Sequence, residues 1–218
     1  MIDLGRLPYE DARARQLELV AERQADRIDD TLIFVEHDHV ITLGRAQKAK
    51  ANVLDAGDVP VLEIERGGDV TYHGPGQLVA YPIVKLAEDE RDLHKFLRAL
   101  EGAVIEVLGA WGIAGVRKDG ATGVWVGASK LCSIGIACRR WVTFHGLALN
   151  VATDLDYFRR INPCGFDSAV MASMTSIAGR AVTIDAVKPG LASALATALG
   201  RTLSAGAATG SARSGDHP

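Results

Sequence analysis

Residues 66–77 constrain the fold of this chain more than any other stretch, and they read Arg-Gly-Gly-Asp-Val-Thr-Tyr-His-Gly-Pro-Gly-Gln. This segment lies between two apolar runs, residues 61–64 and 78–84, that are typical of strands. Glycine costs backbone entropy and gives no side chain to a core, so its density here indicates close backbone approach or positive φ angles. A turn alone needs only a few residues of this chemistry. We therefore interpret the segment as the wall of a ligand pocket, with an irregular, bulged strand pair as the alternative.

The composition excludes several classes of protein. The chain has 218 residues, of which 48% are hydrophobic and 23% charged, as in an ordinary globular domain. Its net charge of −3 is unlike that of a nucleic-acid-binding protein, which is normally basic. No apolar run approaches the ~20 residues that a membrane span needs. The first residues lack the layout of a signal peptide, so we expect a cytoplasmic protein with no membrane or nucleic-acid partner.

The cysteines and histidines do not form the pattern of a metal site. Cys132, Cys138 and Cys164 are too few for a disulfide scaffold, and no two of them form a Cys-x-x-Cys pair. His37 and His39 flank a single residue, but no cluster of further ligands accompanies them. We therefore expect no bound metal.

Hydrophobic periodicity predicts interspersed helices and strands. An apolar stripe at spacings of three and four predicts a helix over residues 90–111 that packs on a sheet. The other elements that the pattern predicts are helices over residues 8–29 and 189–203, a short helix after Thr153 or Asp154, and strands over residues 31–35, 40–43, 61–64, 78–84, 123–127, 130–138 and 141–151. This pattern predicts one α+β domain over residues 1–203. The small and polar residues 204–218 predict a disordered tail.

Cys164 is the best candidate for a nucleophile. It lies between Pro163 and Gly165, which interrupt helices and strands alike, so its thiol is expected on a loop. Cys132 and Cys138 belong to an alternating strand, where cysteines are usually buried and inert. A thiol with a pKa of about 8.5 needs a base or a cation to react near pH 7. His73, His145 and Lys130 are the candidates, and the residues alone do not decide between them.

Four blocks of sequence, in order, resemble a known family. They are the glycine-rich segment 66–77, Gly-Ala-Ser-Lys-Leu-Cys-Ser-Ile-Gly-Ile at 127–136, Phe-His-Gly-Leu-Ala-Leu-Asn-Val at 144–151, and Ile-Asn-Pro-Cys-Gly at 161–165. Together they closely resemble the octanoyl-[acyl-carrier-protein]:protein N-octanoyltransferases of lipoate biosynthesis. The resemblance covers residues 32–177, with minor departures at Leu131 and Asp69.

The resemblance implies a fold, a chemistry and a set of partners. The implied fold is like that of biotin and lipoate protein ligases, a mixed sheet with helices on its outer face. The implied reaction moves an octanoyl group from octanoyl-acyl carrier protein to a lysine of lipoyl domains, in 2-oxoacid dehydrogenase subunits and glycine-cleavage H protein. Cys164 would carry the acyl thioester, Lys130 would lower the pKa of that thiol, and no ATP, metal or other cofactor would be required. The implied substrate-lining residues are Arg66, Gly67, Gly68, Asp69, Val70, Thr71, Tyr72, His73, Ser133, Ile134, Gly135, Gly146, Leu147 and Ala148.

Two other functions share some of these features. An ATP-dependent lipoate or biotin ligase would have the same fold but would not require a cysteine nucleophile. A carrier-protein-binding module that had lost its chemistry would not need both Lys130 and Cys164. The resemblance to octanoyltransferases also implies an acidic carrier protein as donor, which would dock on basic residues near the pocket. The sequence offers Arg45, Lys48 and Lys50, and the Arg139-Arg140 turn, with solvated surface charges as the alternative.

Overall fold

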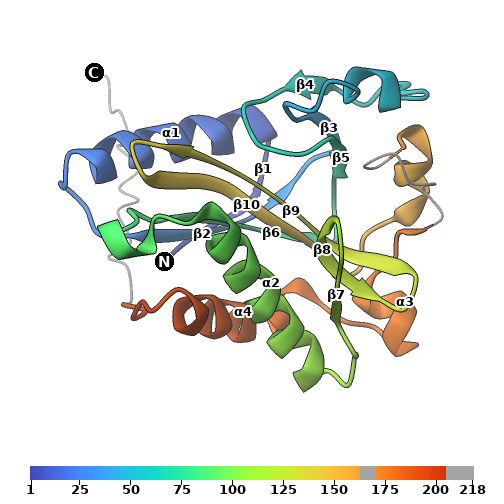
Figure 1. Cartoon of the computed structure of the whole chain (residues 1–218). Helices are drawn as coiled ribbons and strands as arrows, with labels where there is room; N and C mark the ends of the chain where they lie inside the picture. Colours follow the sequence, from blue (N-terminus) through green and yellow to red (C-terminus); the bar gives the residue numbers. More distant parts are fainter. Residues whose placement is uncertain (163–169, 205–218) are drawn as a thin grey trace, which may run out of the picture.

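The computed structural model describes residues 1–162 and 170–204, and it confirms the α+β class (Figure 1). A seven-stranded sheet has the order β1-β2-β6-β10-β9-β8-β7, and a three-stranded sheet has the order β4-β3-β5. The strands are β1 (Ile2–Leu7), β2 (Thr31–His37), β3 (Val40–Leu43), β4 (Val61–Glu63), β5 (Val70–His73), β6 (Gln77–Ile83), β7 (Val116–Lys118), β8 (Ala121–Val126), β9 (Ser129–Arg139) and β10 (Val142–Asn150). Both sheets are mixed, because β1–β2 and β3–β4 are parallel whereas the other pairs are antiparallel.

Helices cover both faces of the large sheet. The helical elements are α1 (Tyr9–Gln24), α2 (Leu93–Ala110), α3 (Met174–Ala178), α4 (Ile184–Ala198) and the short 3-10 turns Lys50–Asn52, Glu88–Glu90 and Leu155–Arg160. Helices α2 and α4 lie side by side on one face, and α1 lies on the other (Figure 1). The predicted stripe of α2 is the buried one, with Leu100 and Val104 fully enclosed. Burying side chains of this kind contributes about 1.5–3 kcal/mol each.

A buried carboxylate ties α2 to the edge of the sheet. The side chain of Glu101 is 1% exposed, and it accepts hydrogen bonds from Arg98 Nη1 at 2.7 Å and Arg117 Nε at 3.2 Å. Its other oxygen accepts the backbone N–H of Gly123 at 3.0 Å. This carboxylate therefore fixes where β8 starts relative to α2.

Three differences from the predicted elements have physical causes. Strand β1 was not predicted, because its short sequence contains Gly5 at φ +61° and pairs only at the sheet edge. Strand β5 lies inside the glycine-rich segment, because its residues 70–73 pair with β3. Helix α4 begins at Ile184 and not at Pro189, because the Thr183 side chain caps it by accepting from Ala186 N.

The central strands carry a local kink opposite Pro82. This proline lies within β6, where it has no N–H to give to β10. On β10, His145 adopts φ +57°, and its backbone N–H is donated instead to Gln16 Oε1 of α1 at 2.8 Å. A left-handed backbone is uncommon for a residue other than glycine, so the strain is local and is held by its surroundings. The kink turns the imidazole of His145 toward α1, where the hydroxyl of Tyr9 lies 3.4 Å from His145 Nδ1.

Candidate active site

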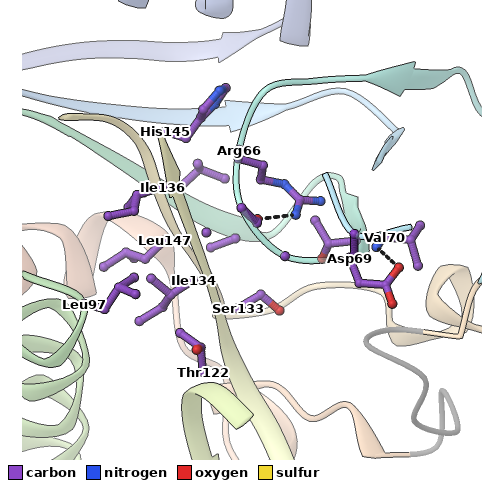
Figure 2. A pocket seen from close by; sticks show the side chains of 18 of the residues that line it. Arg66, Asp69, Val70, Leu97, Thr122, Ser133, Ile134, Ile136, His145 and Leu147 are labelled. Atoms are coloured by element: carbon purple, nitrogen blue, oxygen red, sulfur yellow. Dashed lines mark hydrogen bonds between the residues drawn. The ribbon is translucent and has the colours of Figure 1, made fainter. Parts of the chain in front are cut away.

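A cavity of about 550 Å³ lies between the glycine-rich segment and the β9–β10 pair (Figure 2). Figure 2 places Thr122 and Ser133 toward one end of it and His145 toward the other. The residues proposed from the sequence that line it are Arg66, Gly67, Gly68, Asp69, Val70, Thr71, His73, Lys130, Ser133, Ile134, Gly135, Gly146, Leu147 and Ala148. Three of the four sequence blocks that carried the resemblance therefore meet around one space, whereas residues 163–165 of the fourth lie outside the described part of the chain.

Tyr72 is the exception among the substrate-lining residues proposed from the sequence. Its side chain is fully buried and does not line the cavity. Its ring stacks on Tyr157 at 5.2 Å, and its hydroxyl is 2.7 Å from His39 Nδ1. It alternates with Thr71 and His73 along β5, so it points to the opposite side of that strand. Tyr72 therefore supports the wall from behind.

The glycine-rich segment is hydrogen-bonded to the part of β9 that extends beyond its pairing with β8. The N–H of Gly67 donates to Ile136 O at 2.8 Å. A Cβ added at Gly135 would lie 2.8 Å from Gly67 O, so only glycine allows this approach. The guanidinium of Arg66, only 7% exposed, donates to Thr42 O at 2.8 Å and to Thr42 Oγ1 at 3.0 Å. The wall is thus set by backbone contacts and one buried arginine.

Small residues form the floor of the cavity. Gly135 faces Gly146 across the β9–β10 pair, and Ser133 faces Ala148. A Cβ added at Gly146 would clash with the Ala80 carbonyl oxygen of the neighbouring strand. The residues that form its apolar side walls alternate with this floor and lie toward the α2 face of the strand pair: Ile134, Ile136 and Leu147 of the sheet, with Leu93 and Leu97 of α2. This shape suits a slender apolar group lying along the strands.

Lys130 lies at the cavity with its side chain enclosed, only 4% exposed. Its Nζ is 5.5 Å from the centre of the Trp125 ring, on the neighbouring strand. A Cβ added at Gly123 would come within 2.8 Å of Lys130 Cε, so the stem of the lysine fills the space that this glycine leaves. Along its main chain, Lys130 forms a parallel bridge with Met171, and its carbonyl accepts Ala172 N–H at 3.0 Å.

Cys164 lies outside the described residues, but the chain on both sides of that segment is described. On the N-terminal side, Asn162 N–H donates to Asn52 O at 2.7 Å, and Asn52 Nδ2 donates to Asp69 of the cavity wall at 2.7 Å. On the C-terminal side, Met171 and Ala172 pair with Lys130. Both flanks are therefore bound to elements that line the cavity.

His73 is held neutral and in one tautomer. Complete burial lowers its pKa well below the ordinary value, with the charges of Arg66 and neighbouring histidines acting in the same direction. Its Nδ1 lies 2.7 Å from Gln77 Oε1. Because the Gln77 amide nitrogen donates to Tyr72 O and to Asn150 Oδ1, the Gln77 oxygen is the acceptor and His73 Nδ1 carries the hydrogen.

Among the cavity residues that were not proposed as substrate-lining, three have titratable rings: Tyr9, Tyr81 and His145. Tyr9 comes from α1, far away in the sequence, and no local pattern marks it. Tyr81 alternates as an ordinary strand residue. His145 was considered only as a base, and its turn toward α1 depends on the kink opposite Pro82. Burial lowers the pKa of His145 to about 4, against the opposing effect of Glu65.

The two described cysteines behave as structural residues. Cys132 is fully buried, and burial raises the pKa of its thiol to about 12. Burial also raises the pKa of Cys138. Neither thiol is prepared to react as a thiolate near neutral pH.

The basic residues considered for docking lie in different places. Arg139 and Arg140 are at the far end of β9, about 30 Å from Lys130 at ~3.3 Å per strand residue. They are thus too distant to border the Lys130 end of the cavity. By contrast, Ala46 lines the cavity, and Arg45 N–H donates to Arg66 O, so Arg45 and Lys48 are exposed close to its mouth.

Within residues 1–162 and 170–204, no three or more His, Cys, Asp or Glu side chains gather as metal ligands. Over the same residues, none of the helices combines the length and apolar character needed to cross a membrane.

Comparisons with known proteins agree on a family. Residues 8–196 match the family model described as the lipoyl protein ligase A/B catalytic domain. An octanoyltransferase of Geobacter metallireducens is 47% identical over 190 residues, covering 87% of this chain and 88% of that protein. One from Gloeobacter violaceus is 45% identical, covering 92% and 90%.

Solved structures share the fold at low sequence identity. A lipoate-protein ligase A bound with ATP superposes with a TM-score of 0.71 at 19% identity, covering 92% of this chain and 85% of that one. The biotin protein ligase of Aquifex aeolicus gives a TM-score of 0.53 at 12% identity, covering 92% and 68%. The expected ligase-like fold is thereby confirmed.

Proposed function

Because this chain belongs to the lipoyl protein ligase A/B catalytic-domain family and is an octanoyltransferase, we propose that it acts through a cysteine thioester. The donor is octanoyl-acyl carrier protein. The acceptors are lysines of lipoyl domains, in 2-oxoacid dehydrogenase subunits and in glycine-cleavage H protein. No ATP, metal or other cofactor takes part.

The proposed reaction has two balanced steps. In the first, the Cys164 thiolate attacks the octanoyl carbonyl, and the pantetheine thiolate leaves with a proton from Lys130. In the second, the acceptor amine attacks the acyl-cysteine, the amide forms as the C–S bond breaks and the Cys164 thiolate leaves, and Lys130 takes the proton that the amine gives up. The first step exchanges one thioester for another, and the second is downhill, so no nucleotide is needed to drive either.

The cavity is the observation that carries this proposal. It joins a buried lysine at one end to a floor of Ser133, Gly135, Gly146 and Ala148, with apolar side walls. An acyl chain lying there gains about 0.8 kcal/mol for each buried CH₂ group, or about 5 kcal/mol for most of an octanoyl tail. A polar substrate would gain little from the same walls.

The proposal for Cys164 is supported by its described neighbours. The chain that leads into its segment binds Asn52, which in turn binds Asp69 of the wall. The chain that leaves it pairs with Lys130. An ammonium near a thiol favours the thiolate, and this is the role we assign to Lys130.

Intact mass spectrometry tests the proposal directly. After mixing with octanoyl-acyl carrier protein and no ATP, the wild-type chain should gain the mass of one octanoyl group. Cys164→Ala should lose both the adduct and transfer to a lipoyl domain, whereas Cys132→Ser and Cys138→Ser keep them. Near wild-type transfer by Cys164→Ala would overturn the thioester mechanism.

A second arm of this experiment, with free octanoate and ATP, separates the two alternatives. Transfer of free octanoate that depends on ATP would indicate a ligase, the activity of the structural relatives named above. Binding of the carrier protein with no adduct and no transfer would indicate a module without chemistry.

A further inference from the structure

A continuous series of buried hydrogen bonds starts at the glycine-rich segment. Arg66 Nη2 donates to Thr42 Oγ1 at 3.0 Å. The Thr42 hydroxyl lies 3.5 Å from His73 Nε2, the ring nitrogen that carries no hydrogen. His73 Nδ1 then donates to Gln77 Oε1 at 2.7 Å. These side chains are all less than a tenth exposed.

The series continues to the main chain of Lys130. Gln77 Nε2 donates to Asn150 Oδ1 at 3.0 Å. Asn150 Nδ2 donates to Ala172 O at 3.1 Å. Ala172 N–H donates to Lys130 O at 3.0 Å. The series thereby links β5 of the three-stranded sheet to β6, β10 and β9 of the seven-stranded sheet.

We propose that Gln77 and Asn150 are positioning residues for Lys130, acting through the Ala172 peptide. The proposal rests on the function proposed above, in which Lys130 moves the proton. On one side, the main chain near Lys130 pairs with β8, where Trp125 and Gly123 confine its side chain. On the other side, it is held by the 171–172 segment, and the Asn150 amide fixes the carbonyl of that segment.

The burial of Gln77 and Asn150 makes this arrangement sensitive to the loss of a single hydrogen-bond partner. Gln77 and Asn150 are each 1% exposed, so water does not replace a lost partner. Removing one amide leaves its neighbours unpaired in a medium of low dielectric, and the Ala172 carbonyl then loses the side-chain donor that holds it. Small displacements of a proton-transferring group lower the rate of the chemical step far more than they weaken binding.

The test compares two near-isosteric variants of buried residues on the same strand. Asn150→Leu removes the contact with Ala172. Thr143→Val is the matched control, because Thr143 is also fully buried on β10 and donates to Pro82 O at 2.8 Å, seven residues away from Asn150. Both should lower Tm by a few degrees, about 2–4 °C for each kcal/mol lost.

Kinetics with octanoyl-pantetheine and a lipoyl domain should separate these variants. Asn150→Leu should lower kcat by about 10- to 100-fold with KM unchanged, whereas Thr143→Val keeps kcat. Equal kcat for the two variants would overturn the proposal. If the wild type gave no adduct, or Lys130→Met kept full activity, the proposed function itself would be wrong.

Gln77→Met provides a second test should Asn150→Leu fail to fold. It removes the donor to Asn150 Oδ1 and should lower kcat in the same direction with KM unchanged. If Asn150→Leu does fold, adding Gln77→Met to it should cause no further loss of kcat, because both residues act through one contact. Wild-type kcat in Gln77→Met, or losses that multiply, would count against the proposal.

Discussion

Three buried histidines predict that the fold loses stability in mild acid. Burial lowers the pKa of His37 to about 4 and that of His145 to about 4, and it lowers the pKa of His73 well below its ordinary value. Each is therefore neutral in the folded protein near pH 7. In the unfolded chain each regains a pKa near 6.5.

The sign and size of this change in stability with pH follow from proton linkage. Between pH 6.5 and about 4 the unfolded state binds more protons than the folded state, so the free energy of unfolding falls as pH falls. From pH 7.5 to 5.5, each histidine costs about 1.3 kcal/mol, close to the 1.4 kcal/mol of one pKa unit. Together they remove about 4 kcal/mol from a total that is typically 5–15 kcal/mol.

Urea denaturation followed by tryptophan fluorescence measures this effect. The free energy of unfolding should fall by about 4 kcal/mol between pH 7.5 and pH 5.5. His37→Gln should reduce the pH dependence by about a third, because glutamine forms hydrogen bonds but does not titrate in this range. Thr143→Val, which removes a buried hydrogen bond without a titrating group, should lower stability equally at both pH values. Equal stability of the wild type at the two pH values would refute the reasoning.

Two further predictions concern charged residues. Glu101→Ala should destabilise the fold by about 1–3 kcal/mol, because the Gly123 N–H loses its buried acceptor. The control Glu106→Ala, on the exposed side of α2, should change stability little, and thermal unfolding measures both variants. Arg45→Glu with Lys48→Glu should lower kcat/KM for octanoyl-acyl carrier protein at low salt but not for octanoyl-pantetheine, because only an acidic carrier protein is steered by charge. Arg139→Glu, at the distant end of β9, should leave both donors unchanged, and an equal loss with Arg139→Glu would argue against docking near the cavity mouth.

Local patterns predicted the elements that pack by simple periodicity. The apolar stripe of α2 corresponds directly to its buried face, and the apolar run of β10 corresponds to a strand that is buried at every position, so both followed from the sequence. Strand β5 was missed because glycines surround it and its pairing with β3 involves residues about thirty positions away. The start of α4 was misplaced because a proline in its second turn outweighed the Thr183 cap.

The cavity residues divide in the same way, into those that a local sequence pattern indicated and those whose place depends on distant parts of the chain. Dense glycines indicated a wall, and the wall is there. The contribution of Tyr9 depends on how α1 crosses the sheet, and that of His145 depends on a proline in the neighbouring strand. The hydrogen bonds from His73 to Ala172 join three separate segments of the chain, and no spacing in the sequence records them.

The glycine and alanine floor makes the width of the cavity adjustable in one direction only. At Gly135 and Gly146 the backbone itself forms the surface, so no smaller residue could be substituted there to deepen the cavity. Substitution there can only narrow the channel or displace a strand. Laboratory evolution toward bulkier or branched acyl groups must therefore work through the side walls, at positions such as Leu97 and Ile134, which have atoms to lose.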